Sequence, residues 1–102
     1  MADYILSKKA QEDLRKIWHY TAETWSERQA DFYFQELIQS LNLIAHNPNS
    51  VGRSYEEIRA NYRYRGFHSG RHIIFYRILQ NGKVRIVRIL HERMDFKKHL
   101  LD

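Results

Sequence analysis

The stretch KVRIVRILHERMDFKKHL, residues 83–100, decides the fold because its apolar residues do not follow one simple pattern. A strand that is buried on one face alternates apolar with polar side chains. Here strict alternation would give both faces apolar residues and basic ones: Val84, Ile86, Arg88 and Leu90 on one face, and Arg85, Val87, Ile89 and His91 on the other. Both faces of this strand therefore need a cover, and the rest of the chain has to show where that cover comes from.

Two further strands precede this stretch. Residues 62–68 alternate, with Arg63 and Arg65 on one side of the strand, and residues 71–79 are apolar on both faces. Ser69-Gly70 predicts a two-residue turn between them, and Asn81-Gly82 predicts a type I′ hairpin turn before the last strand. These segments predict three consecutive antiparallel strands.

Two helices are predicted in the first half of the chain. Ser7 is a helix N-cap candidate, and apolar residues then recur at helical spacing as far as Trp25. Ser26 opens the second helix with Gln29 three residues later, which is a capping box, and Asn47-Pro48 ends it. Because almost nothing connects the two helices, they should pack as an antiparallel hairpin. Their apolar stripes are Ala10, Leu14, Ile17, Trp18, Thr21 and Trp25, and Ala30, Tyr33, Phe34, Leu37, Ile38, Leu41, Ile44 and Ala45.

The fold class that these elements predict is α+β. A short strand at residues 3–6 comes first, a loop spans residues 49–61, and residues 93–101 form a polar tail or a short helix. The order is β-α-α-β-β-β, an antiparallel helical hairpin packed on a small twisted antiparallel sheet, in a single domain of residues 1–102. One helical hairpin covers one face of a sheet, so we expect the other face to be a site or the seat of a partner.

Composition restricts the class of protein. The chain has no cysteine, no apolar run long enough to span a membrane and no secretory signal, which predicts a cytoplasmic protein. Residues 1–52 hold five basic and seven acidic side chains, whereas residues 53–102 hold twelve basic and five acidic ones. This asymmetry indicates an acidic partner, either nucleic acid or an acidic protein segment.

No nucleotide-binding loop, metalloprotease motif or serine-hydrolase motif is present, and no cofactor is expected. His68 and His72 straddle a turn, so a metal site there is not favoured over two polar residues at a hairpin end. Basic residues of the sheet could support metal-free RNA cleavage, which needs a base, an acid and cations for the phosphate. They could equally bind a carboxylate-rich peptide or make cross-strand contacts.

The order of elements and several motifs resemble those of the ParE toxins, in the RelE/ParE superfamily of bacterial type II toxin–antitoxin systems. The resemblance spans nearly the whole chain, and its most specific part is the strand that ends in His91, Arg93 and Asp95. It also rests on LSKKAQEDLRKIWHYT, FYFQELIQSLNLIAHNPNSVGRS and IRANYRYRGFHSGRHIIFYRI. Met94 stands where many relatives carry a second arginine.

The resemblance implies a toxin that inhibits DNA gyrase, stabilises cleaved DNA and blocks replication. It also implies a ParD-like antitoxin whose C-terminal segment wraps the toxin, and contact with DNA only through that antitoxin. One alternative is a RelE-like, ribosome-dependent endonuclease of messenger RNA, with Arg65, Arg88 and His91 as catalytic residues. The other is an inactive relative that only binds its antitoxin. Because the end of the chain lacks the terminal catalytic tyrosine of such nucleases, gyrase inhibition without an enzymatic activity is favoured.

Residues expected to contact the target or the antitoxin lie on the basic strands, the tail and the helical hairpin: Trp25, Arg63, Arg65, Arg71, Tyr76, Arg77, Arg88, His91, Arg93, Asp95, Lys97 and Lys98. Trp18 is expected in the core. Trp25 either completes the core, which we favour, or stands exposed as a contact residue. Arg88 is expected to be half buried and paired with Glu92 or Asp95.

Overall fold

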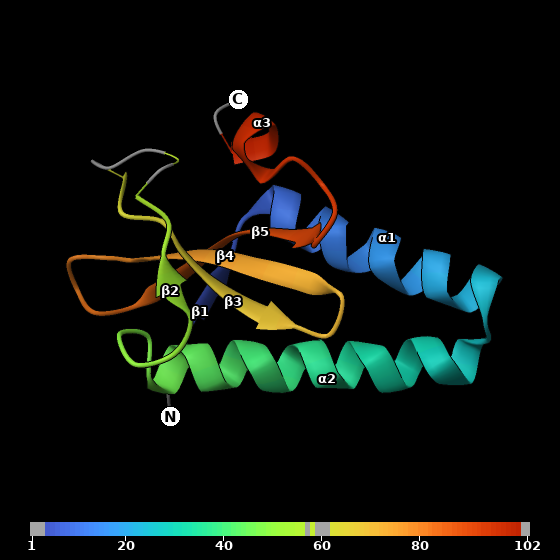
Figure 1. The fold of residues 1–102 in the computed structure, drawn as a ribbon. Helices are drawn as coiled ribbons and strands as arrows, with labels where there is room; N and C mark the ends of the chain where they lie inside the picture. The colour runs from blue at the N-terminus through green and yellow to red at the C-terminus, as the bar shows by residue number, and fades with distance from the viewer. Residues whose placement is uncertain (1–3, 57, 59–61, 101–102) are drawn as a thin grey trace.

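The structure, a computed structural model, describes residues 4–56, 58 and 62–100. Its sheet has five strands in the order β1-β5-β4-β3-β2. Helices α1 and α2 pack on one face of the sheet and α3 lies on the other (Figure 1). The elements in chain order are β1 (Tyr4–Leu6), α1 (Lys8–Thr24), α2 (Glu27–His46), β2 (Arg53–Ser54), β3 (Arg65–Ser69), β4 (His72–Ile78), β5 (Val84–His91) and α3 (Phe96–Leu100).

The predicted α+β class and element order are confirmed, with three refinements. The sheet is mixed, because β1 pairs in parallel with β5 while the other pairs are antiparallel. Strand β2 pairs with β3 inside the predicted loop, of which residues 57 and 59–61 lie outside the described residues. Strand β3 begins at Arg65 rather than at residue 62, because Arg63 has φ of 53° and breaks the extended backbone.

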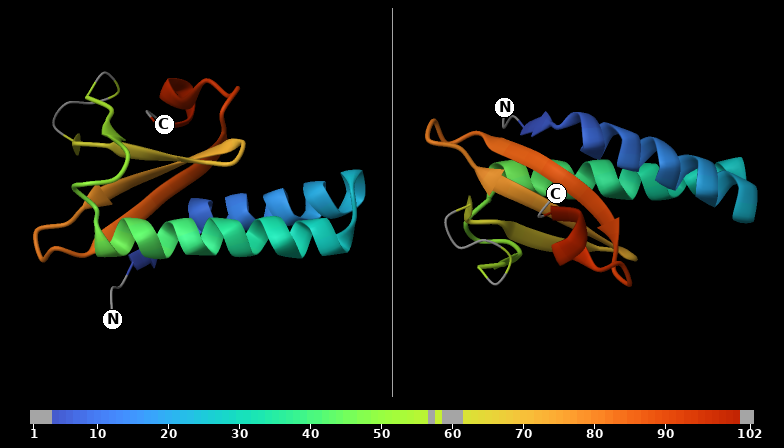
Figure 2. Two further views of the ribbon diagram at one scale, coloured as in Figure 1. Left: turned by 60° about the horizontal axis from the view of Figure 1, so that its bottom comes forward. Right: turned by 90° about the horizontal axis from the view of Figure 1, so that it is seen from above.

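Both predicted helix N-caps are confirmed. The backbone N–H of Ala10 donates to Ser7 Oγ, and that of Gln29 donates to Ser26 Oγ, each at 3.0 Å. Ser7 Oγ also donates to the carbonyl oxygen of Val87 at 2.7 Å, so the start of α1 is tied to β5. The far end of the helical hairpin extends beyond the strands (Figure 2). None of the described helices is long and apolar enough to cross a membrane.

A β-bulge in β5 explains the mixed pattern of the stretch that decides the fold. Phe75 pairs with Arg88 and the next residue, Tyr76, pairs with Ile86, so Val87 is an extra residue on β5. An extra residue reverses the parity of every side chain after it. The predicted two faces therefore hold only before the bulge, and beyond it Ile89 faces the helices instead of Leu90.

Each face of the sheet has its own apolar core. The first core lies under α1 and α2 and is composed of Ala10, Leu14, Leu37, Leu41, Ile44, Ile74, Tyr76, Val84, Ile86 and Ile89. The second core lies on the opposite face and is composed of Tyr55, Ile58, Tyr64, Phe75, Leu90 and Leu100. The second face is therefore covered in part by the chain itself, and the expectation that it is a site or the seat of a partner stays a prediction. Tyr55 and Ile58, which follow β2, cover this face together with α3. Helix α3 is amphipathic rather than a polar tail, because Leu100 is buried and the Phe96 ring packs against those of Tyr55 and Phe75.

The turns differ in type from those predicted. Gly82 N–H donates to the carbonyl oxygen of Leu79 at 2.9 Å, and Leu79 N–H donates to that of Lys83 at 2.8 Å. Gly82 has φ of 85°, whereas Asn81 is not among the described residues with positive φ. A type I′ turn needs positive φ at both central residues, so this is a three-residue loop instead. The β3–β4 turn is formed by Gly70 and Arg71, because Ser69 already pairs with His72.

An ion pair between α1 and β5 fixes the helical hairpin against the edge of the sheet. Asp13 accepts from Arg88 Nε at 2.8 Å and from Arg88 Nη2 at 3.0 Å. Asp13 Oδ2 also accepts from the backbone N–H of Ile89 at 2.9 Å. The Asp13 and Arg88 side chains are only 10% and 16% exposed. The bond with Asp13 raises the pKa of the Arg88 guanidinium. Arg88 is thus half buried and paired, as predicted, but not with Glu92 or Asp95.

Replacing Asp13 with alanine should lower the free energy of unfolding by about 3–5 kcal/mol, because it leaves the Arg88 guanidinium and the Ile89 N–H without their acceptor. Urea unfolding followed by circular dichroism measures this loss. D13N should lose less, since an amide oxygen can still accept from Ile89.

A matched control is Asp31→Ala, because Asp31 is exposed and accepts one hydrogen bond, from Trp18 Nε1 at 2.9 Å. It should cost less than about 1 kcal/mol. The double variant D13L/R88M should recover much of the loss, since removing both partners of a buried ion pair costs less than removing one. Equal losses for D13A and D31A would contradict the role given to Asp13.

Candidate functional site

The residues predicted from sequence to form one basic surface lie in separate parts of the fold. Arg65 and Tyr76 hold the loop after α2, and Arg88 pairs with α1. A second group surrounds the β3–β4 turn, and the remaining residues lie near the segment before β3, on or beside α3, or at the end of the helical hairpin. Each group is therefore described by what its side chains contact.

Arg65 and Tyr76 hold the loop after α2 against the sheet. Arg65 Nε donates to Tyr76 Oη at 3.2 Å, and Arg65 Nη2 donates to the Val51 carbonyl oxygen at 3.0 Å. Tyr76 Oη lies 2.7 Å from the Pro48 carbonyl oxygen and 3.0 Å from that of Val51. Because Tyr76 is fully buried, it offers no surface to a target or antitoxin in this structure. The contacts of Arg65 fall on the helix face of the sheet rather than on an open one.

Arg77 and Arg63 lie near the segment that precedes β3. Arg77 Nε donates to the Tyr62 carbonyl oxygen at 2.8 Å, and its guanidinium lies 5.2 Å from the centre of the Tyr62 ring. Arg63 is exposed. The half-buried Arg77 therefore stabilises the segment over the second core, while Arg63 remains available for a contact.

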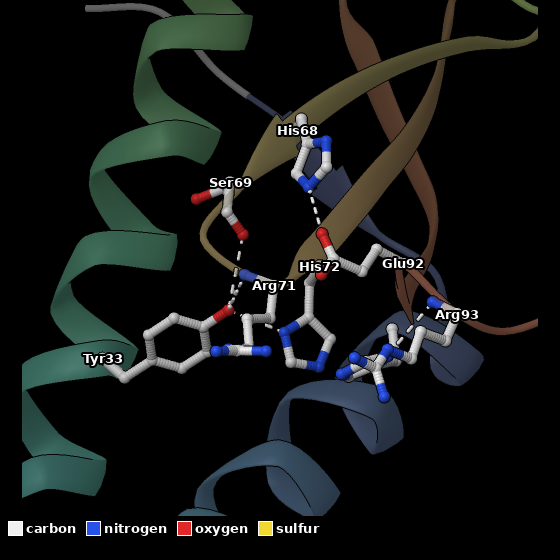
Figure 3. A network of polar contacts seen from close by, with 8 residues as sticks. Tyr33, His68, Ser69, Arg71, His72, Glu92 and Arg93 are labelled. Atoms are coloured by element: carbon white, nitrogen blue, oxygen red, sulfur yellow. Dashed lines mark hydrogen bonds and ion pairs between the residues drawn. The ribbon is translucent and has the colours of Figure 1, made fainter.

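A polar cluster surrounds the β3–β4 turn, and we call it the turn cluster (Figure 3). It comprises Tyr33, His68, Ser69, Arg71, His72, His91, Glu92 and Arg93. Tyr33, on α2, is its centre: its hydroxyl accepts from the Arg71 N–H at 3.0 Å and lies 2.7 Å from His72 Nδ1 and 3.3 Å from the Ser69 carbonyl oxygen.

Gly70 makes this close approach possible. Its φ of +59° suits a glycine, and a Cβ atom there would lie 2.6 Å from a ring carbon of Tyr33. The Ser40 and Ser69 hydroxyls, 2.7 Å apart, add a second link between α2 and the turn. The turn is therefore held rigidly against α2, which positions the side chains that project from it.

The two histidines of the turn cluster have different environments. The three contacts of the Tyr33 hydroxyl are met together when it donates to Ser69 and accepts from His72 Nδ1–H, which leaves His72 Nε2 without a proton. His91 Nδ1 accepts from the Arg93 N–H at 3.1 Å, so its proton is on Nε2. The ring centres of the two histidines are 5.4 Å apart. One imidazole thus presents an acceptor nitrogen and its neighbour a donor.

Burial, together with the neighbouring His91, lowers the pKa of His72 to about 4, so His72 is neutral at pH 7. Burial likewise raises the pKa of the Tyr33 hydroxyl. His68 Nε2 lies 2.7 Å from Glu92 Oε1, and this bond lowers the pKa of the Glu92 carboxyl group. Arg71 and Arg93 are exposed beside these groups. At neutral pH the turn cluster therefore offers two exposed guanidinium groups on a rigid base, which suits recognition of carboxylates or phosphates.

The tryptophans do not lie in the core. Trp25 is 75% exposed at the end of the helical hairpin, so the favoured core assignment is wrong and the alternative, an exposed residue, is correct. Trp18 is half buried and donates to Asp31 on α2. Trp25 is the C-cap of α1, at the connection to α2, and this end of the hairpin extends beyond the strands (Figure 2).

The C-terminal residues of the prediction lie on or beside α3. Lys97 and Lys98 are exposed, and Asp95 precedes the helix. The Asp95 carbonyl oxygen accepts from the His99 N–H at 3.4 Å. The two lysines add exposed positive charge to the face opposite α1 and α2.

No group of three or more metal-ligating side chains occurs in the described part of the chain. His68 bonds to Glu92, and His72 bonds to Tyr33. The two histidines that the sequence analysis considered for a metal site are therefore bonded to other side chains.

Sequence reasoning did not assign roles to Asp13, to the Tyr33 hydroxyl or to His72. Asp13 had a signal: it lies three residues after Ala10 and directly before Leu14, within the apolar stripe of α1. A carboxylate at such a position needs a partner. Tyr33 and His72 had no such signal in the sequence, because their contact depends on α2 lying beside the β3–β4 turn.

The stability of the fold should fall with acidification between about pH 6.5 and 4, because His72 is neutral when folded and takes up a proton when unfolded. The folded pKa is the lower one, so the stability is full above pH 6.5 and is lost as pH falls towards 4. Urea midpoints at pH 7 and pH 5 measure this. H72Q should show a smaller fall than the wild type, since glutamine does not titrate.

H19Q is the matched control, because His19 is exposed on α1. Its midpoints should fall with pH as those of the wild type do. A fall in H72Q as large as in the wild type would show that other groups cause the acid sensitivity.

The chain is similar to known toxins over nearly its whole length. Residues 4–96 match the family described as the ParE toxin of the type II toxin–antitoxin system, parDE. Toxin ParE1 of Mycobacterium tuberculosis H37Rv is 40% identical over 97 residues, which are 95% of this chain and 96% of the relative. Toxin ParE1 of Caulobacter vibrioides is 39% identical over 100 residues, 98% of this chain and 99% of the relative. Toxin ParE of Escherichia coli is 32% identical over 102 residues, covering 100% and 96%.

Among solved structures, a chain of the chromosomal ParDE toxin–antitoxin system from P. aeruginosa superposes with a TM-score of 0.76. The match covers 89% of this chain and 96% of that one at 18% identity, which shows a shared fold. The sequence matches go further, because they cover nearly all of both partners at 32–40% identity. The chain belongs to the ParE toxin family of type II toxin–antitoxin systems.

Proposed function

We propose that this ParE-family toxin inhibits DNA gyrase, stabilises cleaved DNA and is neutralised by a ParD-like antitoxin in the cytoplasm. The observation that carries the proposal is the match to ParE toxins along nearly the full length of both chains. A match of that extent includes the segments after β5, where the sequence resemblance is most specific.

The geometry favours an inhibitor over a nuclease that uses the three catalytic residues considered from sequence. Arg65 is bonded to loop carbonyl oxygens, and Arg88 is bonded to Asp13. His91 lies at the far end of β5, opposite His72. Because the two guanidinium groups are engaged in holding the fold, they are not free to bind a phosphate beside His91.

The exposed part of the turn cluster is the surface that we assign to gyrase. Arg71 and Arg93 are exposed, and the backbone beneath Arg71 is held by Tyr33. Rigid support matters because an ordered side chain loses less entropy on binding. Trp25, 75% exposed at the projecting end of the hairpin, is a further contact candidate, since exposed aromatic residues often anchor interfaces.

The antitoxin is the second partner. The parDE family pairs a toxin with an antitoxin, and the related P. aeruginosa structure is of a ParDE system. The exposed lysines and arginines of the second half of this chain would suit an acidic antitoxin segment. The cytoplasm follows as the location, because gyrase and its DNA are there.

RNA cleavage is the second candidate, favoured by one observation. His72 and His91 present an acceptor and a donor nitrogen on rings 5.4 Å apart, with two exposed arginines nearby. Metal-free RNA cleavage uses such a base, acid and cation set. In this case His72, a weak base with its pKa of about 4, would take the 2′-hydroxyl proton, and an imidazolium form of His91, released from the Arg93 N–H, would protonate the leaving oxygen.

Purified toxin without antitoxin should inhibit supercoiling by gyrase and trap linear DNA in the presence of ATP, because the proposed action stabilises the cleaved complex. Agarose gels of plasmid DNA measure both effects. Ribosome-dependent cleavage of messenger RNA, with no effect on gyrase, would support the second candidate instead. A folded protein that does neither is the inactive relative considered from sequence.

R71E/R93E should weaken gyrase inhibition by about tenfold or more, because it reverses the two exposed positive charges of the arginines in the turn cluster. The matched control is K16E/R28E, which makes the same change in net charge at exposed positions of α1 and α2. Equal losses in the two variants would argue against the turn cluster as the contact surface. Unchanged thermal unfolding of both variants shows that the fold is intact.

A further inference from the structure

A basic groove lies between the start of α1, strand β5 and α3, away from the turn cluster. It has a volume of about 500 Å³ and is lined by Ser7, Lys8, Lys9, Tyr64, Arg85, Val87, Arg88, His99 and Leu100. This volume is in the range of ligand pockets, about 300–1,000 Å³, and is much larger than a single ion needs. The groove can therefore hold a segment of several residues.

The charged side chains that line this groove are all of one sign, positive. Five of its lining side chains are basic or can become so, and none of the nine is acidic. Arg88 is neutralised by Asp13, but Lys8, Lys9 and Arg85 are exposed and have no ion pair within the described part of the chain. Three uncompensated positive charges thus face one concave surface.

The position of the two lysines makes this arrangement unfavourable for the isolated fold. The first turn of α1 contains no acidic residue, although the positive end of a helix dipole favours acidic side chains. Lys8 and Lys9 place like charges at that end, and Arg85 adds a third. A bound anionic group would relieve this repulsion. The three positive charges therefore favour binding of an anion, although they do not stabilise the isolated fold.

The walls of the groove are apolar as well as basic. Val87 is half buried, and Leu100 and Tyr64 are each only 5% exposed. These side chains line the groove beneath the exposed cationic groups. An occupant that matches both features carries carboxylates next to apolar side chains.

We infer that this groove binds a short acidic peptide segment of a partner protein, with an apolar side chain against Val87 and carboxylates on Lys8, Lys9 and Arg85. Arginine binds carboxylates with two parallel hydrogen bonds, which fixes orientation as well as charge. The inference deepens the proposed antitoxin partnership and rests on that half of the proposed function. It does not depend on gyrase as the target.

A nucleic acid fits the groove less well. Proteins that bind single strands stack the bases on exposed aromatic rings along a basic track. The tyrosine ring that lines this groove, that of Tyr64, is buried and packs near Tyr62, with ring centres 5.8 Å apart. The half-buried imidazole of His99 is the other aromatic ring of the lining, so the groove offers charge but little surface on which bases can stack.

Titration of the full, ¹⁵N-labelled chain tests the inference, since amide shifts detect even weak binding. The probes are an acetylated Glu-Leu-Glu-Glu-Leu-Glu peptide, its Gln-Leu-Gln-Gln-Leu-Gln counterpart and a single-stranded thymidine hexanucleotide. The acidic peptide should shift the amide signals of Lys8, Lys9, Arg85 and His99, and the neutral peptide should not. No shifts, shifts spread evenly over the surface, or tighter binding of the oligonucleotide at the same amides would each overturn the inference.

Charge-reversal variants add a matched comparison. K8E/R85E should weaken binding of the acidic peptide by about tenfold or more, and K16E/R28E, with the same change in net charge outside the groove, by less than about twofold. Equal weakening would mean non-specific attraction and would overturn the inference. These binding experiments contain no gyrase, so a toxin that does not inhibit gyrase can still bind the acidic peptide. Failure of peptide binding and failure of gyrase inhibition can therefore be told apart.

Discussion

Asp13 is the side chain on which the arrangement of helices and sheet depends. Strand β1 pairs with β5 only as far as Ile86, and beyond that point no strand in the described part of the chain lies beside this edge of β5. The Ser7 hydroxyl meets the carbonyl oxygen of Val87, and the Asp13 carboxylate meets the N–H of Ile89. The first turns of α1 thus replace the missing strand, because a buried edge must have its polar groups bonded. The bidentate bond with Arg88 compensates the burial of the Asp13 charge.

The β-bulge and this ion pair act together. The extra residue, Val87, moves Ile89 onto the helix face and lets Arg88 meet α1. It also moves Leu90 onto the opposite face, where the second core forms. A single irregularity in β5 therefore supplies apolar contacts to both layers. That is why so short a chain can bury two faces of one sheet, with α3 as the cover of the second.

This use of the second face changes what a partner can bind. Part of the apolar surface on that face is already covered by the chain itself, so recognition uses what remains exposed. The exposed groups include two arginines on the turn cluster and two lysines and an arginine around the basic groove, and also large apolar side chains such as Tyr20, Trp25 and Phe32. One surface is at the β3–β4 turn and the other at the start of α1. The two proposals made above therefore assign the target and the antitoxin to different sites.

The sequence by itself determined the two capped helices, the three long strands, the α+β class and the toxin family, because caps, apolar periodicity and turn residues are local signals. It also places Asp13 within an apolar stripe, a position at which a carboxylate needs a bonding partner. Only the tertiary structure decided the bulge, the cover of the second face and the contact of Tyr33 with His72. Each of these depends on which residues meet across the fold, and strand register and helix position are set by packing of the whole chain rather than by neighbours in sequence.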